Sequence, residues 1–430
     1  MNKLLSEKLN AVALQVPDIL FPREGIDLTK FSCIAADQYT QDLAYWDRVR
    51  KFIGDAPSTY NLIYPEAEYI RDIHVGAVSL ASPLAETHVG GKQSTGLFST
   101  ASPLSVGASY ASPNEIVATK IKNINNCMNK YITDGTYENI GKAFIFVERK
   151  SPSQNRRGLL VAIDLEKYDY NEGAKTLIRA TEKTVKDRLT LRKEIRENAT
   201  LDLPHILVLI NDKEDKLFKK VESIKFETFF RMSGESKNDI LYDFDLMENS
   251  GYIKGYKIAD DKDIESIADI LIELKDKSED GFLYAIGDGN HSLAAAKDIY
   301  EKTGRGRYAL VELVNIYDDG IRFFPIHRLI MGVEGDKFIA DTGIDPDNPP
   351  PLQELQTRLD KFNYNIDYIH GKKECIELGK KPGNIAITYD GFSIETLFSD
   401  VVKYGSLCRK SFSLGEAKDK RFYLEAQEII

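Results

Sequence analysis

Cysteine is scarce in this chain of 430 residues, and the four cysteines lie far apart with no CxxC pair among them. They are Cys33, Cys127, Cys375 and Cys408. A structural zinc site or a disulfide framework needs clustered or regularly spaced cysteines, so the sequence argues against both. Unpaired cysteines are typical of a reducing compartment, and we expect a cytoplasmic protein.

Long hydrophobic runs are also missing, because the sequence contains no stretch of about 18 consecutive apolar residues, the length that a membrane-spanning helix requires. The first twenty residues are interrupted by polar side chains, namely Ser6, Glu7, Lys8 and Asn10. They therefore lack the apolar core of a secretory signal. We expect no membrane partner.

Basic residues are not in excess, since the formal net charge is −10. This argues against a chain-wide basic surface for nucleic acid but not against a local basic patch, and we do not expect nucleic acid as a partner. Several familiar motifs are absent too: the P-loop, the GxSxG elbow, the HExxH zinc helix and a GxGxxG turn opening a helix. Any nucleotide or catalytic site must be built in another way.

What the sequence does contain is a mixture of strand-like and helix-like segments, which predicts an α+β or mixed α/β fold. Residues 142–150 and 158–165 predict a hairpin, as do 307–317 with 321–330, and 384–389 with 392–398 across Asp390-Gly391. Residues 205–210 predict a buried strand. Helical spacing of apolar residues predicts helices over 263–277 and 292–304.

The domain organisation is predicted from composition. Residues 335–354 are rich in Pro, Asp and Gly and indicate a linker or loop. They would separate a main region, residues 1–334, from a smaller C-terminal lobe, residues 355–430. Residues 81–113 are poor in charge and rich in Ser, Gly, Ala and Pro, which is typical either of a long ordered loop or of a series of turns.

A first candidate site follows the strand-like residues 281–286. Asp288, Gly289, Asn290, His291 and Ser292 form a polar turn before an Ala-rich helix. A strand–turn–helix gathers backbone N–H groups and the positive helix end at one point, which suits phosphate. The carboxylate could also ligate Mg²⁺. The alternative is an ordinary turn in which Asn290 or Ser292 caps the helix.

Three further stretches place polar groups beside apolar ones. In residues 178–199, Arg188 and Arg192 share a predicted helix face with aliphatic residues, just after Glu182. Such arginines either pair with carboxylates or lead to an anion. In residues 31–49, Asp37 follows a short strand and either lines a site or caps the next helix.

The last of these stretches, "FFPIHRLI" at 323–330, carries His327 and Arg328 inside an apolar strand. Alternation along a strand sends the two side chains to opposite faces, so one of them can reach a site. A lone histidine in a strand is otherwise satisfied by a hydrogen bond.

Together the four stretches resemble the bacterial family called domain of unknown function 1015. The motifs that carry the resemblance are "AADQYT" at 35–40, "RATEKTVKDR" at 179–188, "GDGNHS" at 287–292 and "PIHR" at 325–328. The chain departs from the family pattern at Asn290, where a His is common, at Ser292, where an Arg is common, and at Ala180-Thr181, where a His usually precedes the Glu. The turn at 287–292 is similar, more remotely, to the ParB/sulfiredoxin-like superfamily, which includes free-serine kinases and CTP-binding partition proteins.

The resemblance implies a ParB/sulfiredoxin-like nucleotide-binding core and an enzyme that transfers a phosphoryl group from ATP or ADP, with Mg²⁺, to a small hydroxyl metabolite such as free serine. A non-catalytic nucleotide- or metabolite-binding regulator related to ParB-like proteins is the alternative, and a homo-oligomer is possible in either case. By position, the roles would be shared among eleven residues. The catalytic group would be Glu182, Asp37, Asp288 and His291, with Asp288 also holding the metal, and the nucleotide-binding group would be Gly289, Asn290, Ser292, Arg179, Arg188, Arg328 and His327.

Overall fold

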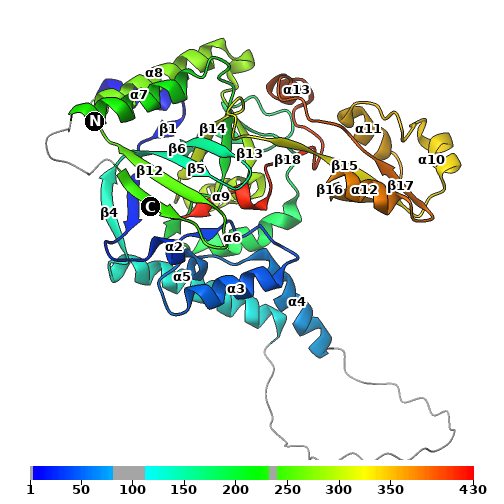
Figure 1. Ribbon diagram of the computed structural model, residues 1–430, viewed down its shortest axis with the longest axis horizontal. Coiled ribbons are helices and arrows are strands. Elements are labelled where there is room, and N and C mark those ends of the chain that lie inside the picture. Colours follow the sequence, from blue (N-terminus) through cyan, green and yellow to red (C-terminus); the bar gives the residue numbers. More distant parts are fainter. Residues whose placement is uncertain (1–2, 81–111, 232–239) are drawn as a thin grey trace, which may run out of the picture.

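The computed structural model describes residues 3–80, 112–231 and 240–430 (Figure 1). The low-charge stretch 81–113 lies outside the described residues except for its last two. Of these, Ser112 caps helix α5 (Pro113–Thr133) with a capping box that includes Glu115. None of the helices in the described ranges has the length and apolar character that a membrane crossing needs.

A ten-stranded mixed sheet forms the centre of the molecule and confirms the predicted mixed α/β class. Most neighbouring strands are antiparallel, while β10 with β14, β8 with β13, and β7 with β8 are parallel. In spatial order the strands are β11 (Ile240–Asp245), β12 (Tyr252–Ile258), β5 (Phe144–Lys150), β6 (Asn155–Asp164), β14 (Tyr308–Asn315), β10 (Leu207–Ile210), β13 (Tyr284–Asp288), β8 (Ile178–Ala180) and β7 (Tyr168–Asp169), with β1 (Leu14–Gln15) beside β6.

Alternation along the strands divides the core into two layers, one on each face of the sheet. Phe144 and Phe146 of β5 pack with α1 (Lys3–Ala11), α7 (Lys216–Arg231) and α8 (Asp261–Lys277). Ile145 and Val147 face the other way, toward α3 (Leu43–Ile53) and α5. Figure 1 shows α7 and α8 on one side of the sheet and α2 (Leu28–Phe31), α3 and α5 on the other.

Local predictions are confirmed where short-range patterns decide the element. The hairpin of 142–150 with 158–165 is β5 paired with β6, and residues 205–210 contain the buried strand β10. The helix expected at 263–277 is α8. The helix expected at 292–304 is α9 (Asn290–Thr303), which ends at Gly304 in the left-handed conformation that glycine adopts readily.

Two predicted hairpins are wrong. Strand β14 pairs with β6 and β10, whereas β15 (Phe323–Met331) pairs with strands of another sheet. Residues 392–398 form no strand. Instead, the chain enters helix α13 (Leu397–Tyr404), whose residues Leu397 and Val401 are buried on one helical face. A short apolar run does not by itself distinguish a strand from a helix, which explains this error.

A second sheet organises the small lobe. Strand β15 pairs with β16 (Asn365–His370), β17 (Asn384–Ile387) and β18 (Phe412–Leu414). The expected linker 335–354 contains helix α10 (Gly335–Thr342), and helix α11 (Leu352–Leu359) begins in it. Phe338 and Leu355 from these helices are fully buried beside Ile330 of β15. These few buried residues were not apparent from the polar composition of the stretch, and strand β15, which precedes it, shares a sheet with β16 and β17.

The C-terminal residues do not stay in the small lobe but return to the main body. Strand β19 (Phe422–Tyr423) pairs with β3 (Cys33–Ile34), and β20 (Gln427–Glu428) pairs with β9 (Leu201–Asp202). On the way, Arg421 reaches Glu312 of β14, with 2.5 Å between Nη1 and Oε2. Glu312 also contacts Arg156 of β6, with 2.9 Å between Oε1 and Nε. This buried ion network ties the returning segment to the centre of the sheet.

We expect Glu312→Ala to lower the free energy of unfolding by about 3–5 kcal/mol, because it leaves Arg156 buried without a carboxylate and Arg421 with only Glu425 as its partner. Urea unfolding followed by circular dichroism measures this. As a control, Glu354→Ala removes a half-exposed helical ion pair with Arg358 and should cost about 0.5 kcal/mol or less. A loss for Glu312→Ala as small as that of the control would contradict the role of the network.

The network also predicts a pH dependence. Burial alone would raise the pKa of Glu312, but Arg156 and Arg421 outweigh burial and hold the pKa below its ordinary value. The contribution of Glu312 to stability is therefore complete at neutral pH and is lost as the pH falls through the lowered pKa.

Candidate functional site

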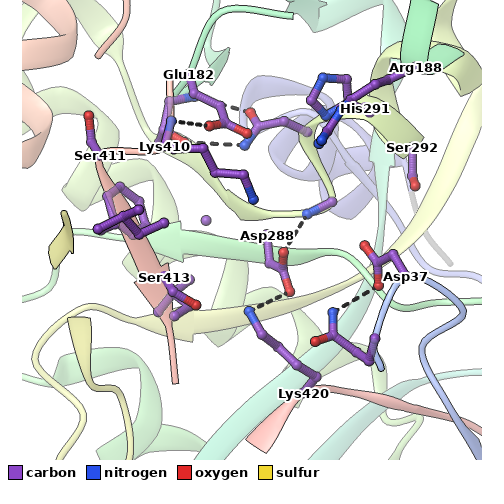
Figure 2. A pocket seen from close by; sticks show the side chains of 18 of the residues that line it. Asp37, Glu182, Arg188, Asp288, His291, Ser292, Lys410, Ser411, Ser413 and Lys420 are labelled. Atoms are coloured by element: carbon purple, nitrogen blue, oxygen red, sulfur yellow. Dashed lines mark hydrogen bonds and ion pairs between the residues drawn. The ribbon is translucent and has the colours of Figure 1, made fainter. Parts of the chain in front are cut away.

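A polar cavity of about 330 Å³ lies where β13 ends and α9 begins. Figure 2 shows that its side chains come from distant parts of the chain: from the segments around residues 37 and 182, from the 288–292 turn, and from the C-terminal residues 410–420. Eight of the eleven predicted site residues line the cavity. They are Asp37, Glu182, Arg188, Asp288, Gly289, Asn290, His291 and Ser292.

The turn between β13 and α9 depends on Gly289, which has a φ of +81°. A Cβ there would come within 2.9 Å of Ile206 Cγ1, so glycine is required by conformation and by space. Gly289 is also the N-cap residue, and no side chain caps the helix. The alternative in which Asn290 or Ser292 caps α9 is therefore wrong, and the first helical N–H groups are available to a ligand.

Asn290 instead ties this turn to the segment that carries Glu182. Its Oδ1 accepts from the backbone N–H of Thr181 at 3.2 Å, and its Nδ2 donates to the carbonyl oxygen of Ile286 at 3.3 Å. Asn290 is buried. An amide both accepts and donates, so asparagine at this position fastens the two motifs together.

Four cationic side chains line the cavity. Two of them meet carboxylates: Lys420 Nζ lies 3.0 Å from Asp288 Oδ2, and Arg192 pairs with Glu66. Within the described part of the chain, Arg188 and the ammonium of Lys410 have no carboxylate partner. Four carboxylates also line the cavity, so its formal charge is balanced, but Arg188 and Lys410 are not held in ion pairs and can bind an incoming anion.

Burial and the neighbouring cations both affect the pKa of His291. Burial, together with Arg192, Arg188 and Lys410, lowers its pKa to about 4. Its Nε2 accepts a hydrogen bond from the backbone N–H of Val185 at 3.3 Å, as a neutral imidazole can. At neutral pH the ring is therefore uncharged and can donate only through Nδ1.

Asp37 stands at the edge of the cavity, next to groups that stabilise its charge. Burial would raise its pKa, but His205, Arg192 and a 2.9 Å hydrogen bond from Gln38 outweigh burial, so the pKa lies below its ordinary value. Figure 2 shows Asp37 and Asp288 in the same part of the cavity. Asp37 is thus an ionised, weakly basic carboxylate.

Glu182 is fixed by the C-terminal segment. Its Oε2 accepts from the backbone N–H of Lys410 at 3.1 Å, and its own backbone bridges to Leu407. Lys410 has a φ of +56°, a conformation that non-glycine residues adopt only when surrounding contacts hold it. The hydrogen bond to Glu182 is one of those contacts.

Arg328 supplies the others and, contrary to expectation, does not line the cavity. It has no exposed surface. Its Nη1 donates to the carbonyl oxygen of Lys410 at 2.8 Å, and its Nη2 donates to that of Arg409 at 2.9 Å. Arg328 is therefore a positioning residue for Lys410.

Arg179 and His327 also lie away from the cavity. Arg179 donates to the carbonyl oxygen of Thr176 at 2.8 Å, pairs with Asp280 at 3.1 Å and covers the ring of Phe282. In the small lobe, His327 accepts at Nδ1 from the backbone N–H of Tyr389 at 3.3 Å. Both side chains have the ordinary structural roles of a buried arginine and a buried histidine, and neither can contact a ligand in the cavity.

Sequence reasoning missed the C-terminal contribution to the cavity. Lys410, Ser411, Ser413 and Lys420 line it together with His370. The available signal was the density of basic and hydroxyl residues in "CRKSFS" and "KDKR". Because residues 355–430 were predicted to form a separate lobe, they were not expected to line the site.

Metal binding has limited support from the donor set. Among the described residues, no group of three or more His, Cys, Asp or Glu side chains is arranged to hold a metal ion. Asp288 already accepts from the backbone N–H of Gly289 at 3.1 Å and from Lys420. Mg²⁺, however, commonly binds through one or two carboxylates, with waters and substrate phosphates as its other ligands. These residues therefore fit Mg²⁺ binding through one carboxylate with waters and phosphates, and not a site built from protein ligands alone.

Fold and site together define a mixed α/β protein with a polar cavity, lined by both cations and carboxylates, at a strand–turn–helix junction. The chain belongs to the family described as "Protein of unknown function (DUF1015)", whose model matches residues 102–347, more than half of the 430 residues. This confirms the resemblance drawn from the motifs. The match includes the motifs at 179–188, 287–292 and 325–328 but neither Asp37 nor the C-terminal lysines.

Similar solved structures include free serine kinase in complex with AMP, with 13% identity and a TM-score of 0.33, covering 62% of this chain and 91% of that one. A mutant of free serine kinase in complex with ADP has 12% identity and a TM-score of 0.35, covering 62% and 92%. SbnI with a C-terminal truncation, from Staphylococcus aureus, has 10% identity and a TM-score of 0.32, covering 60% and 82%. No curated protein matches the chain. Likeness at these TM-scores carries no functional argument, which must come from the cavity itself.

Because Arg188 and Lys410 have no carboxylate partner among the described residues, we predict that the cavity binds inorganic pyrophosphate. Replacing Lys410 with Met should weaken binding about tenfold or more, because a charge-assisted hydrogen bond contributes about 1.5–3 kcal/mol. Isothermal titration calorimetry measures the affinity, with the exposed Lys403→Met as the matched control. Equal affinities for Lys410→Met and the unmodified protein would show that Lys410 does not bind the anion.

Proposed function

We propose that the protein is a nucleotide-dependent phosphotransferase that moves the terminal phosphoryl group of ATP or ADP to the hydroxyl of a small metabolite such as free serine. One observation carries this proposal. The uncapped N-terminus of α9 lines the same cavity as Arg188 and Lys410, which have no carboxylate partner among the described residues. The carboxylates Glu182, Asp37 and Asp288 line that cavity too. The core would then be a nucleotide-binding core of the ParB/sulfiredoxin-like kind that the motifs resemble.

In this proposal the phosphates bind at the start of α9. The N–H groups of Asn290, His291 and Ser292 have no partners inside the helix, and the positive end of the helix favours a dianion or trianion. Lys410 and Arg188 supply full charges. They also replace the arginine that the family pattern places at Ser292.

The transfer itself needs positioning and charge stabilisation more than covalent chemistry. The acceptor oxygen forms a bond to the terminal phosphorus while the bond from that phosphorus to the bridging oxygen breaks. The hydroxyl proton passes to a carboxylate, and ADP leaves when ATP is the donor, or AMP when ADP is. Arg188 and Lys410 stabilise the negative charge on the transferring group.

Glu182 is the better candidate for the base. Asp37 has a lowered pKa and so accepts a proton less readily. The hydrogen bond from Lys410 engages Oε2 of Glu182 and orients the carboxylate. Glu182 also lies beside Lys410, the cation best placed to hold the group that is transferred.

Magnesium fits this proposal as an ion that enters with the nucleotide and uses Asp288 as its carboxylate ligand. When bound, it would neutralise charge on the phosphates. Lys420 also pairs with Asp288, so its ammonium group and Mg²⁺ would compete for the same carboxylate.

Glu182→Gln tests the base. Gln retains an oxygen that accepts from the N–H of Lys410, so the fold and nucleotide affinity should persist while turnover falls about 10²–10⁴-fold. Coupled detection of ADP or AMP release, with serine, threonine and glycerate as acceptors, measures turnover. Glu172→Gln, on the surface beside Lys183, is the control.

Asp37→Asn distinguishes the two carboxylates in the same assay. A larger loss for Asp37→Asn than for Glu182→Gln would give the role of base to Asp37. Nucleotide binding without turnover for every acceptor would favour the non-catalytic regulator instead. Failure of both ATP and ADP to bind would remove the proposal altogether.

Asp288→Asn tests the metal. Asn can still accept from the N–H of Gly289 but loses the charge that pairs with the buried Lys420, so we expect a modest loss of stability, slower turnover and a higher magnesium concentration for half-maximal activity. A magnesium titration of activity measures this. An unchanged magnesium requirement would exclude Asp288 as a ligand.

A further inference from the structure

A second cavity, of about 150 Å³, adjoins the polar one. The two share Asp37, Glu66, Arg192 and Ser292 in their linings, so they lie side by side. Unlike the first, the second is lined mainly by aliphatic and aromatic side chains. We call it the apolar cavity.

The walls of the apolar cavity come from helix α6 (Thr190–Glu197) and the residues that follow it, packed against aromatic side chains. Leu191 and Ile195 project from α6, with Leu203 beyond it. Tyr64 and Tyr423 also line the cavity, and the ring of Tyr423 lies edge-on to His205 with 5.5 Å between centroids. Such walls suit a flat, apolar group.

Two residues that line this cavity each have a nitrogen without a hydrogen-bond partner among the described residues. These nitrogens are Nη2 of Arg196 and Nδ1 of His205, both buried from solvent. One other nitrogen of each residue is engaged: Arg196 Nη1 donates to Asp202 at 2.5 Å, and His205 Nε2 lies 2.8 Å from Ser292 Oγ. A buried donor without a partner costs free energy, so a ligand with polar edge atoms gains by supplying one.

We propose that the apolar cavity holds the base of the nucleotide, an inference that rests on the phosphotransferase proposed above. A nucleobase combines apolar faces with ring-nitrogen and carbonyl acceptors at its edge, which matches aliphatic walls beside an unpartnered arginine nitrogen. Its phosphates then pass Ser292 and Arg192 into the polar cavity. Glu182 and Lys410 line only the polar cavity and therefore meet the terminal phosphate.

The acceptor metabolite is the other possible occupant, and the geometry disfavours it. Its hydroxyl must reach the proposed base Glu182, which does not line the apolar cavity. A small polar acceptor would also leave the aliphatic walls unfilled. The base is therefore the component that the apolar cavity selects.

Filling the cavity tests the inference. Ile195→Phe adds a ring to a partly buried helical isoleucine that lines the apolar cavity, while Ile272→Phe makes the same change on α8, away from it. Calorimetric titrations with ATP and with inorganic tripolyphosphate compare a ligand with a base and one without. We expect Ile195→Phe to weaken ATP about tenfold or more and to leave tripolyphosphate within about twofold, with Ile272→Phe unchanged for both.

The outcomes separate the two proposals. Equal affinity of the unmodified protein for ATP and tripolyphosphate, or an unchanged ATP affinity in Ile195→Phe, would overturn the inference and leave the phosphotransferase standing. Absence of ATP and ADP binding to the unmodified protein would overturn both. Leu203→Phe fills the same cavity from another segment, so the comparison can be made with either variant that shows a native thermal transition.

Discussion

The fold brings its site together through one buried ion network, in which Glu312 on the central sheet holds Arg156 and the C-terminal Arg421. Charges this deep are stable only when each has its partner, so the position of the C-terminal segment is closely specified. That segment then delivers Lys420 to the cavity, and strands β19 and β20 extend it along the main body. Without the ion pair between Glu312 and Arg421, the C-terminal segment that lines one side of the cavity would no longer be held in place.

Within the cavity, charge is arranged unevenly. Some cations pair with carboxylates, as Lys420 does with Asp288. Arg188 and Lys410 have no such partner among the described residues and can bind an incoming anion. Arg328 was expected from the sequence to bind a ligand, but it donates hydrogen bonds to the backbone carbonyl oxygens of residues 409 and 410. The small lobe thus contributes to the site through the segment it positions.

What sequence could predict was local. The turn from Asp288 to Ser292, helix α8 and the β5–β6 hairpin depend on residues close together along the chain, and their patterns identified them. The meeting of Asp37, Glu182 and Asp288 was expected from family motifs. The roles of Lys410 and Lys420 could not be predicted, because they depend on pairing between segments almost four hundred residues apart, such as β3 with β19. No periodicity records such a contact.

The route of the C-terminal segment also has a consequence for biosynthesis. A ribosome makes residues 37, 182 and 288–292 well before residues 410–428, so the nascent protein carries the helix end and the carboxylates without the lysines that face them. The cavity stays incomplete, and its neighbouring core partly uncovered, until translation has passed that segment. Premature termination in the final strands should therefore yield chains that lack one wall of the cavity and are prone to degradation.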